Sequence, residues 1–236
     1  MYLAVVRRFP DLGFRMRIYT TYVDARRVVL VAWCLLVSST KPIHAADRPL
    51  LVCYGDSITA GLGLASSDAY PADLQKLLDA HGYAYKVVNQ GTSGATTKDA
   101  SAGLPFLLRL HPSIVIVEFG GNDGLRGLPV GQTRNNLDHV LTGLEKARVQ
   151  ILLAGITLPP DYGPDYIRSF QQVFRELAAK HRVAFVPMLY KNLVNVPGTI
   201  QSDGIHPTAK GSSIIAGTLF SALKPLLRKS PWNLPV

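Results

Sequence analysis

Three side chains of this 236-residue sequence could together perform nucleophilic catalysis. Ser57 follows a short apolar run, and a serine hydroxyl becomes an effective nucleophile when a neighbouring base removes its proton. His206 is a candidate base, and Asp203 precedes it by three residues, close enough to accept a hydrogen bond from the second imidazole nitrogen. Such a carboxylate would fix the tautomer and orientation of the ring. These residue types therefore predict acyl transfer.

Acyl transfer also needs hydrogen-bond donors around the negative charge that develops on the carbonyl oxygen. Ser57 is expected to open a helix, so its backbone N–H would face the site. Gly94 has no side chain to hinder the approach of its own N–H, and the Asn122 side chain could supply a third donor. The sequence thus offers a candidate oxyanion hole, in which one donor can contribute about 3–4 kcal/mol.

Apolar runs alternate with amphipathic segments from residue 50 onward. The runs predict five short strands, at residues 50–54, 85–88, 113–119, 150–154 and 183–186, of which those at 50–54 and 113–119 are expected to be buried. Helical spacing of apolar residues predicts helices at residues 70–81, 98–110 (with Pro105 as a candidate break), 137–147, 165–181 and 207–227. This alternation is typical of a three-layer α/β/α sandwich around a parallel sheet.

In such a sheet the functional site lies beyond the carboxyl ends of the strands. Small and polar residues follow the predicted strands, at residues 55–57, 89–94, 120–124, 157–160 and 203–207. Gly, Ser and Asn are ordinary turn residues, so one such segment alone would mean little. Five segments on one edge indicate a site, and they contain all the candidate catalytic residues.

The sequence resembles the SGNH, or GDSL, hydrolases. Four blocks typical of that family have counterparts here in the same order, at residues 55–57 (GDS), Gly94, 120–123 (GGND) and 203–207 (DGIHP). The longer runs EFGGNDGLRG and LPPDYG are similar to those of the family's bacterial periplasmic thioesterases, lysophospholipases and arylesterases.

The resemblance implies a flavodoxin-like sheet in one SGNH hydrolase domain, with Ser57 as nucleophile, His206 as base and Asp203 as its orienting partner. It implies an oxyanion hole made by the Ser57 and Gly94 N–H groups and Asn122. It also implies that residues 124–129 form a mobile loop that contacts the substrate.

Several residues near this edge are candidates for contact with the substrate: Asp56, Leu125, Leu158, Pro159 and Tyr162. Asp56 is also expected to bond neighbouring backbone, and Asp123 to help hold its loop. Tyr162 and Tyr166 could line an acyl or aryl pocket or cover the core, and both alternatives stay open. Asp161 stands where the thioesterase pattern has Asn, which makes substrate preference harder to predict than the chemistry.

The composition, 47% hydrophobic and 17% charged, is that of a globular protein. Two cysteines exclude a disulfide scaffold, and Cys53, in an apolar strand, is expected to be buried. No zinc-ligand or phosphate-loop spacing is present, so we expect no metal, organic cofactor or nucleotide. The remaining histidines of the domain are expected at the surface, and the apolar residues of the second helix in the core: His81, His111, His139 and His181, and Leu104, Phe106, Leu107 and Leu108.

The N-terminal segment has the features of a secretory signal peptide. Arg26 and Arg27 precede the ten-residue apolar run VVLVAWCLLV, and small residues follow it. The run is shorter than the roughly 20 residues of a spanning helix, although an uncleaved anchor remains the alternative. We expect residues 1–45 to be removed, with Met16 as an alternative start, leaving a domain of residues 46–236 in the periplasm or medium. Seven of the 25 Lys and Arg residues lie in the removed segment, so the net charge of +9 does not indicate a nucleic-acid partner.

The preferred hypothesis is an exported serine esterase that hydrolyses aryl or short-to-medium acyl esters, thioesters or lysophospholipids through an acyl-enzyme on Ser57. Its partners would be small substrates, with no stable membrane insertion after cleavage. The first alternative is a carbohydrate O-acetylesterase of the same family, against which stands the lack of an aromatic platform, since Trp232 is the one tryptophan after residue 45. The second alternative is a non-catalytic periplasmic binding protein.

Overall fold

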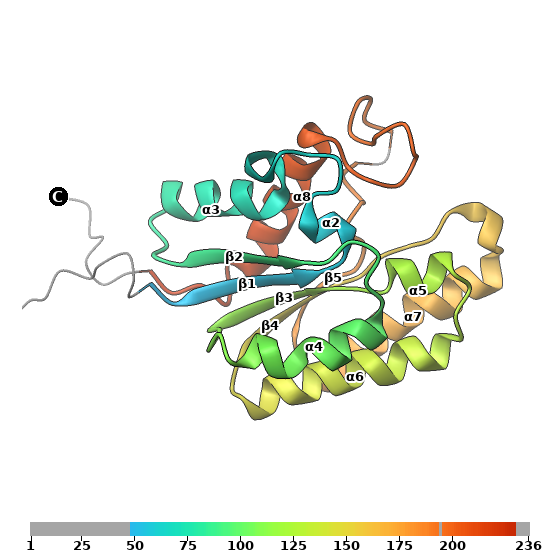
Figure 1. The fold of residues 1–236 in the computed structure, drawn as a ribbon, viewed down its shortest axis with the longest axis horizontal. Helices are drawn as coiled ribbons and strands as arrows, with labels where there is room; N and C mark the ends of the chain where they lie inside the picture. The colour runs from blue at the N-terminus through green and yellow to red at the C-terminus, as the bar shows by residue number, and fades with distance from the viewer. Residues whose placement is uncertain (1–47, 194, 230–236) are drawn as a thin grey trace, which may run out of the picture. The chain divides into compact units, whose positions relative to one another are not determined.

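A parallel β-sheet forms the centre of the protein in the computed structural model, which describes residues 48–193 and 195–229. Its five strands have the spatial order β2-β1-β3-β4-β5, and all neighbouring pairs are parallel (Figure 1). The strands are β1 (Leu50–Gly55), β2 (Lys86–Gly91), β3 (Ile114–Glu118), β4 (Gln150–Ala154) and β5 (Ala184–Val186). This order is the flavodoxin-like one, which confirms the predicted fold class.

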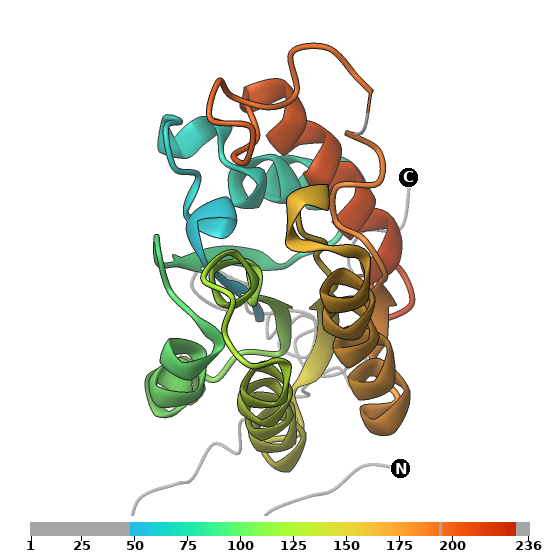
Figure 2. The same ribbon diagram turned by 90° about the vertical axis from the view of Figure 1, so that its right-hand side faces the viewer.

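Helices cover both faces of the sheet (Figures 1 and 2). Helices α3 (Tyr70–Ala80) and α8 (Ala209–Leu223) pack together on one face. Helices α4 (Thr97–Leu108), α6 (Val130–Lys146) and α7 (Pro164–His181) cover the other. Four short elements lie in the connections: α2 (Ser57–Ala60), α5 (Gly121–Leu125) and the 3-10 turns η2 (Ser66–Asp68) and η3 (Pro160–Tyr162).

The core forms where the apolar strand residues meet the apolar stripes of the helices. Every residue of β3 is buried, because helices lie on both sides of this central strand. Cys53 is buried in β1 as expected, and burial raises the pKa of its thiol to about 12, so the thiol stays protonated and unreactive. Among the described residues no helix is both long and apolar enough to cross a membrane.

Helix boundaries differ from the predictions where polar residues obscure the apolar period. Helix α6 begins at Val130 instead of residue 137, since its first two turns are mostly polar. Helix α8 begins at Ala209, because the Thr208 hydroxyl accepts a hydrogen bond from the Gly211 N–H and caps it. Helix α4 continues through Pro105 without a break.

Two side chains lie in unexpected environments. Phe106, expected in the core, is 69% exposed, because it lies on the outer side of α4 against the Arg109 guanidinium. His181, expected at the surface, has a side chain only 4% exposed. It bridges α6 and α7 by contacting Asp138 and Glu145, so it is part of the packing between two helices.

Candidate active site

Ser57, Asp203 and His206 lie in one hydrogen-bonded line at the carboxyl edge of the sheet. His206 Nε2 is 2.9 Å from Ser57 Oγ, although 149 residues separate them. His206 Nδ1 is 2.7 Å from Asp203 Oδ2. The fold therefore brings together the three side chains that the sequence analysis selected for nucleophilic chemistry.

The turn between β1 and α2 positions Ser57. Asp56 Oδ1 accepts a hydrogen bond from the Ile58 N–H at 3.0 Å and caps α2, so Ser57 becomes the first residue of that helix. Gly55 is required before it, since a Cβ there would lie 2.0 Å from Thr59 Oγ1 and 2.7 Å from the Glu118 carbonyl oxygen. Ser57 is 8% exposed, with its hydroxyl directed to His206.

Asp203 is held by its own loop. Its Oδ1 accepts hydrogen bonds from the backbone N–H groups of Ile205, at 2.9 Å, and His206, at 3.0 Å. The Ile205 N–H and then the His206 ring lower the pKa of Asp203 to about 2. The carboxylate is therefore ionised at neutral pH, and one oxygen remains for His206 Nδ1.

The candidate oxyanion donors lie on the neighbouring loops. Gly94 has φ of +79°, a conformation that favours glycine, and its carbonyl accepts a hydrogen bond from Arg126 at 2.9 Å. Asn122 Nδ2 donates to the Ala95 carbonyl at 2.9 Å and to Asp56 Oδ2 at 3.3 Å. Figure 2 faces this edge, with α2 in blue next to α5 in yellow-green.

The five candidate substrate contacts occupy different environments. Asp56 is 2% exposed and directs its carboxylate to Ile58 and Asn122, into the protein rather than toward solvent. Leu158 is also buried, Leu125 and Tyr162 are half-buried, and Pro159 is exposed.

Two tyrosines connect η3 and α7 to residues 124–129, which comprise the end of α5 and the loop that follows it. Tyr162 donates its hydroxyl hydrogen to the Leu125 carbonyl at 2.7 Å, and Tyr166 donates to the Leu128 carbonyl at 2.8 Å. Both rings also pack against the core. Asp123 anchors the start of this loop by accepting hydrogen bonds from the Thr97 N–H and hydroxyl, which is the structural role expected for it.

Replacing Tyr162 with phenylalanine is expected to loosen the 124–129 loop without unfolding the protein. The change removes one hydrogen bond, worth about 0.5–1.5 kcal/mol, and keeps the ring. Amide hydrogen exchange at residues 125–128 should accelerate about 2- to 10-fold. Tyr83→Phe, on α3's side of the sheet against Phe220, is the matched control. Unchanged exchange in the loop of the Tyr162 variant would show that its hydroxyl does not hold the loop.

Gln201 was not identified from the sequence, yet it joins the two halves of the site. Its Nε2 donates to the Leu62 carbonyl at 2.8 Å, just after α2, and to the Pro207 carbonyl at 2.9 Å, next to His206. Its backbone N–H donates to the His206 carbonyl at 2.8 Å. A single glutamine in a polar loop gives no sequence signal for such a bridge.

The Gln201→Ala variant is expected to lower kcat about tenfold. It breaks two hydrogen bonds that hold the His206 loop against the Ser57 segment, and small displacements of reacting groups are costly. Ester hydrolysis by the purified variant is the measurement, with Gln172→Ala on the exposed side of α7 as control. Equal kcat values for the two variants would contradict the bridging role.

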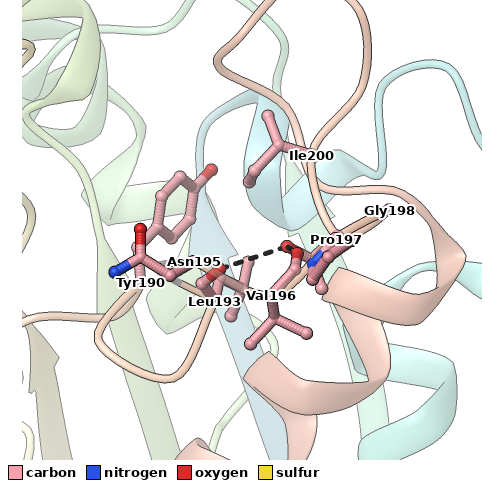
Figure 3. Close-up of a pocket in the computed structure, with 8 residues that line it drawn as sticks. Tyr190, Leu193, Asn195, Val196, Pro197, Gly198 and Ile200 are labelled. Atoms are coloured by element: carbon pink, nitrogen blue, oxygen red, sulfur yellow. Dashed lines mark hydrogen bonds between the residues drawn. The ribbon is translucent and has the colours of Figure 1, made fainter.

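A cavity of about 420 Å³ lies beside the segment that leads into the His206 loop (Figure 3). Its lining residues are Tyr190, Leu193, Asn195, Val196, Pro197, Gly198, Thr199 and Ile200. Tyr190 donates its hydroxyl hydrogen to the Ile205 carbonyl at 2.9 Å, and Ile200 pairs with Pro207. The cavity thus borders the back of the catalytic loop, and none of the five candidate substrate contacts lines it. Within the described part of the chain, no cluster of three or more His, Cys, Asp or Glu side chains is placed to hold a metal ion.

A parallel α/β sandwich that joins Ser, His and Asp side chains at its carboxyl edge has the architecture of a serine hydrolase. Residues 53–214 match the GDSL-like lipase/acylhydrolase family. The chain belongs to this family and is a hydrolase, which sets aside the non-catalytic binding protein.

Similar bacterial proteins are also esterases or thioesterases by name. Esterase TesA of Pseudomonas aeruginosa is 42% identical over 203 residues, covering 85% of this chain and 100% of the relative. Thioesterase 1/protease 1/lysophospholipase L1 of Escherichia coli is 37% identical, covering 81% and 90%. The crystal structure of TesA superposes with a TM-score of 0.73 at 42% identity, covering 75% of this chain and 99% of that one.

Proposed function

We propose that the protein is a serine esterase that hydrolyses carboxylic esters and thioesters through an acyl-enzyme on Ser57. The observation that carries the proposal is the hydrogen-bonded line from Asp203 through His206 to Ser57, with distances of 2.7 and 2.9 Å. Ser57 Oγ attacks the substrate carbonyl while His206 Nε2 takes its proton. His206 then gives that proton to the leaving alcohol or thiol, and the acyl group remains on Ser57.

Water completes the reaction by the same steps. His206 removes a proton from a water molecule, whose oxygen attacks the acyl-enzyme carbonyl, and then returns the proton to Ser57 Oγ as the carboxylic acid leaves. Asp203 remains ionised throughout and stabilises the imidazolium, in keeping with its pKa of about 2. The cycle returns Ser57 and His206 to their starting protonation states and uses no cofactor.

The oxyanion of each tetrahedral intermediate would lie among the Ser57 N–H, the Gly94 N–H and Asn122 Nδ2. The contact of 3.3 Å between Asn122 and Asp56 is the longer of the two that its amide makes, so this N–H is the one more easily redirected to the oxyanion. Arg126 donates to the Gly94 carbonyl, which belongs to the peptide group that follows the second donor, and so restrains the loop next to that donor.

The proposed substrates are small acyl compounds: aryl esters, short-to-medium acyl esters, acyl thioesters and lysophospholipids. The names of the relatives support this range, and an arylesterase of Vibrio mimicus, 32% identical, extends it to aryl esters. An acetylated carbohydrate is the second candidate, favoured by an acetylxylan esterase of Xylanibacter ruminicola that is 26% identical and half covered by this chain. Relative kcat/KM for p-nitrophenyl butyrate, lysophosphatidylcholine and acetylxylan distinguishes the two.

The proposal is tested by labelling the protein with a fluorophosphonate and identifying the modified peptide by mass spectrometry. We expect the label on Ser57, together with loss of p-nitrophenyl butyrate hydrolysis. The protein has an internal comparison, because Ser101 Oγ also contacts a histidine, His139 Nδ1, at 2.8 Å. Label on Ser101, or no covalent label at all, would overturn the proposal.

We further propose that the enzyme is exported after removal of residues 1–45. The apolar run behind Arg26 and Arg27 supports this, although it lies outside the described residues. Mass spectrometry of the N-terminus of protein isolated from a bacterial periplasm should find a chain starting near residue 46. Recovery of the uncleaved chain in the membrane fraction would support an anchor instead.

A further inference from the structure

Glu118 is a buried carboxyl group directly beneath the turn that carries Ser57. It is the last residue of β3 and pairs in register with Gly55 of β1. Its side chain is 1% exposed, at the centre of a sheet whose other β3 residues are apolar. One acidic residue at the end of an apolar run gives no sequence signal for a role beyond that of an ordinary strand terminus.

One oxygen of Glu118 is bonded, and the other is not. Oε2 accepts a hydrogen bond from the Thr59 hydroxyl at 2.8 Å and another at 3.3 Å from the Asp56 N–H, which also donates to the Glu118 backbone carbonyl at 3.2 Å. Oε1 has no hydrogen-bond partner among the described residues and is inaccessible to solvent. A charged carboxylate with a buried, unpartnered oxygen is strongly disfavoured, whereas a neutral acid needs far less solvation.

The charge of one neighbouring group also disfavours a negative charge on Glu118. Asp56 faces it from the turn after β1, Cys53 from β1 itself, Tyr70 from α3, and Tyr190 from the segment after β5. Burial raises the pKa of Cys53, Tyr70 and Tyr190 and keeps them neutral, so of these four groups only Asp56 can place a negative charge next to Glu118. The charge of His206 acts on Asp56. Burial, followed by the Asp56 charge, raises the pKa of Glu118 well above its usual value.

The Glu118 carboxyl group lies against Gly55 and so can influence the position of Ser57, two residues further along the chain. A Cβ on Gly55 would lie 2.5 Å from Glu118 Oε2, so the carboxyl group packs directly against the backbone of the turn. It accepts a hydrogen bond from the Thr59 hydroxyl in α2, after Ser57, and another from the Asp56 N–H, immediately before Ser57. Glu118 therefore holds the backbone on both sides of the nucleophile, with its carboxyl group on the Thr59 side and with both its carboxyl group and its backbone carbonyl on the Asp56 side.

We propose that Glu118 is a positioning residue that works as an uncharged acid, fixing the 55–59 turn so that Ser57 Oγ stays within reach of His206. It does not contact the substrate and acts only through the backbone and Thr59. The inference rests on the proposed function for its effect on rate, but the neutral state of Glu118 can be tested without any substrate.

The first test is the pH dependence of thermal unfolding for the wild type and Glu118→Gln. A neutral buried acid has a pKa raised in the folded state, so its contribution to stability is complete below the unfolded pKa and is lost as pH rises toward the folded pKa. Glutamine mimics the neutral acid at every pH. The variant's Tm minus the wild-type Tm should therefore increase by roughly 3–5 °C per pH unit above about pH 5.

Glu176→Gln is the matched control on the surface. The Arg134 guanidinium lowers the pKa of Glu176, so this ion pair already contributes fully above the ordinary pKa of Glu, and the Tm of Glu176→Gln minus the wild-type Tm should not increase above about pH 5. A Tm difference for Glu118→Gln that is constant with pH, or that falls as pH rises, would show that Glu118 is charged and overturn the inference.

The second test separates positioning from folding. At neutral pH Glu118→Gln should keep kcat for p-nitrophenyl butyrate within about threefold, while Glu118→Asp, which withdraws the carboxyl group by one methylene, should lose up to about 10²-fold in kcat with KM nearly unchanged. A folded Glu118→Gln protein without activity, or a fully active Glu118→Asp protein, would overturn the positioning role. If the wild type itself neither hydrolyses the ester nor takes the label on Ser57, the proposed function fails, and the unfolding series still decides the charge of Glu118.

Discussion

Replacing Ser57 with alanine is expected to lower kcat for p-nitrophenyl butyrate by about 10⁴- to 10⁶-fold. The substitution removes the attacking oxygen, which lies 2.9 Å from His206 Nε2, but it keeps the backbone N–H and the start of α2. KM should change little, because ground-state binding does not depend on the attack. Initial rates under saturating substrate give kcat, and circular dichroism confirms that the variant is folded.

Ser101→Ala is the control for this experiment. Ser101 and His139 form a second serine–histidine contact, at 2.8 Å between α4 and α6. This pair lies away from the loops at the carboxyl edge, and no carboxylate hydrogen bond to the His139 ring accompanies it among the described contacts. A hydroxyl next to an imidazole is not sufficient for catalysis, so this variant should retain full activity. If Ser101→Ala were as damaged as Ser57→Ala, or if Ser57→Ala stayed active, the assignment of the nucleophile would be wrong.

The layout of the site was predictable because a parallel sheet constrains it so strongly. Ser57 and His206 are far apart in sequence, but each follows a strand, and parallel strands end at the same edge. The fixed three-residue spacing of Asp203 and His206 allowed their contact to be predicted without knowledge of the fold. The Ser57–Asp203–His206 arrangement therefore follows from topology and local spacing, both of which the sequence pattern carries.

The supporting contacts were not predictable, because they depend on side-chain packing across the fold. Gln201 bridges to Leu62, 139 residues away, and nothing in either residue's local sequence indicates that meeting. Glu118 lies in an apolar strand whose pattern predicts burial but not how a carboxyl group there is accommodated. Phe106 shows the converse error, since its residue type predicts burial while the direction of its helix face exposes it. Hydrophobic patterning thus determines the layers of this fold more fully than it determines individual polar contacts.

The two tyrosines near the site have a role that neither of the two sequence-based interpretations included. Tyr162 and Tyr166 could have lined a pocket or covered the core. Their rings do pack against the core, but their hydroxyl groups bind the carbonyls of the 124–129 loop. Their position thus connects the interior to a loop next to Asn122. Substitutions in η3 and α7 are therefore expected to affect that loop as well as stability.

The Asp203→Asn variant is expected to lose on the order of 10³- to 10⁴-fold in kcat. The loop around Asp203 determines how the new amide must lie. The N–H groups of Ile205 and His206 both donate to Oδ1, so they will select the amide oxygen at that place. The amide NH₂ group then faces His206 Nδ1, where the carboxylate oxygen accepted before at 2.7 Å.

An NH₂ donor opposite Nδ1 stabilises the wrong tautomer of the ring. Nδ1 would accept, so the single proton of the neutral imidazole would lie on Nε2, which could no longer take the proton of Ser57. Nitrogen NMR of the His206 ring should show this exchange of tautomers directly, in a protein that is otherwise folded. A variant with the original tautomer and a large loss of kcat would indicate that Asp203 acts through its charge alone.

The pH dependence of the same variant tests the charge of Asp203. Its pKa is lowered to about 2 from 3.8, so its stabilising effect is present above the unfolded value and is lost as pH falls toward 2. The Tm of the wild type minus that of Asp203→Asn should therefore persist down to about pH 4 and decrease as pH falls further toward 2. Asp165→Asn, which removes an exposed carboxylate paired with Arg168, is the control, and its Tm should stay close to that of the wild type over the same pH range. A Tm difference that is already lost at about pH 5 would mean that Asp203 becomes protonated well above its lowered pKa, which its three hydrogen bonds argue against.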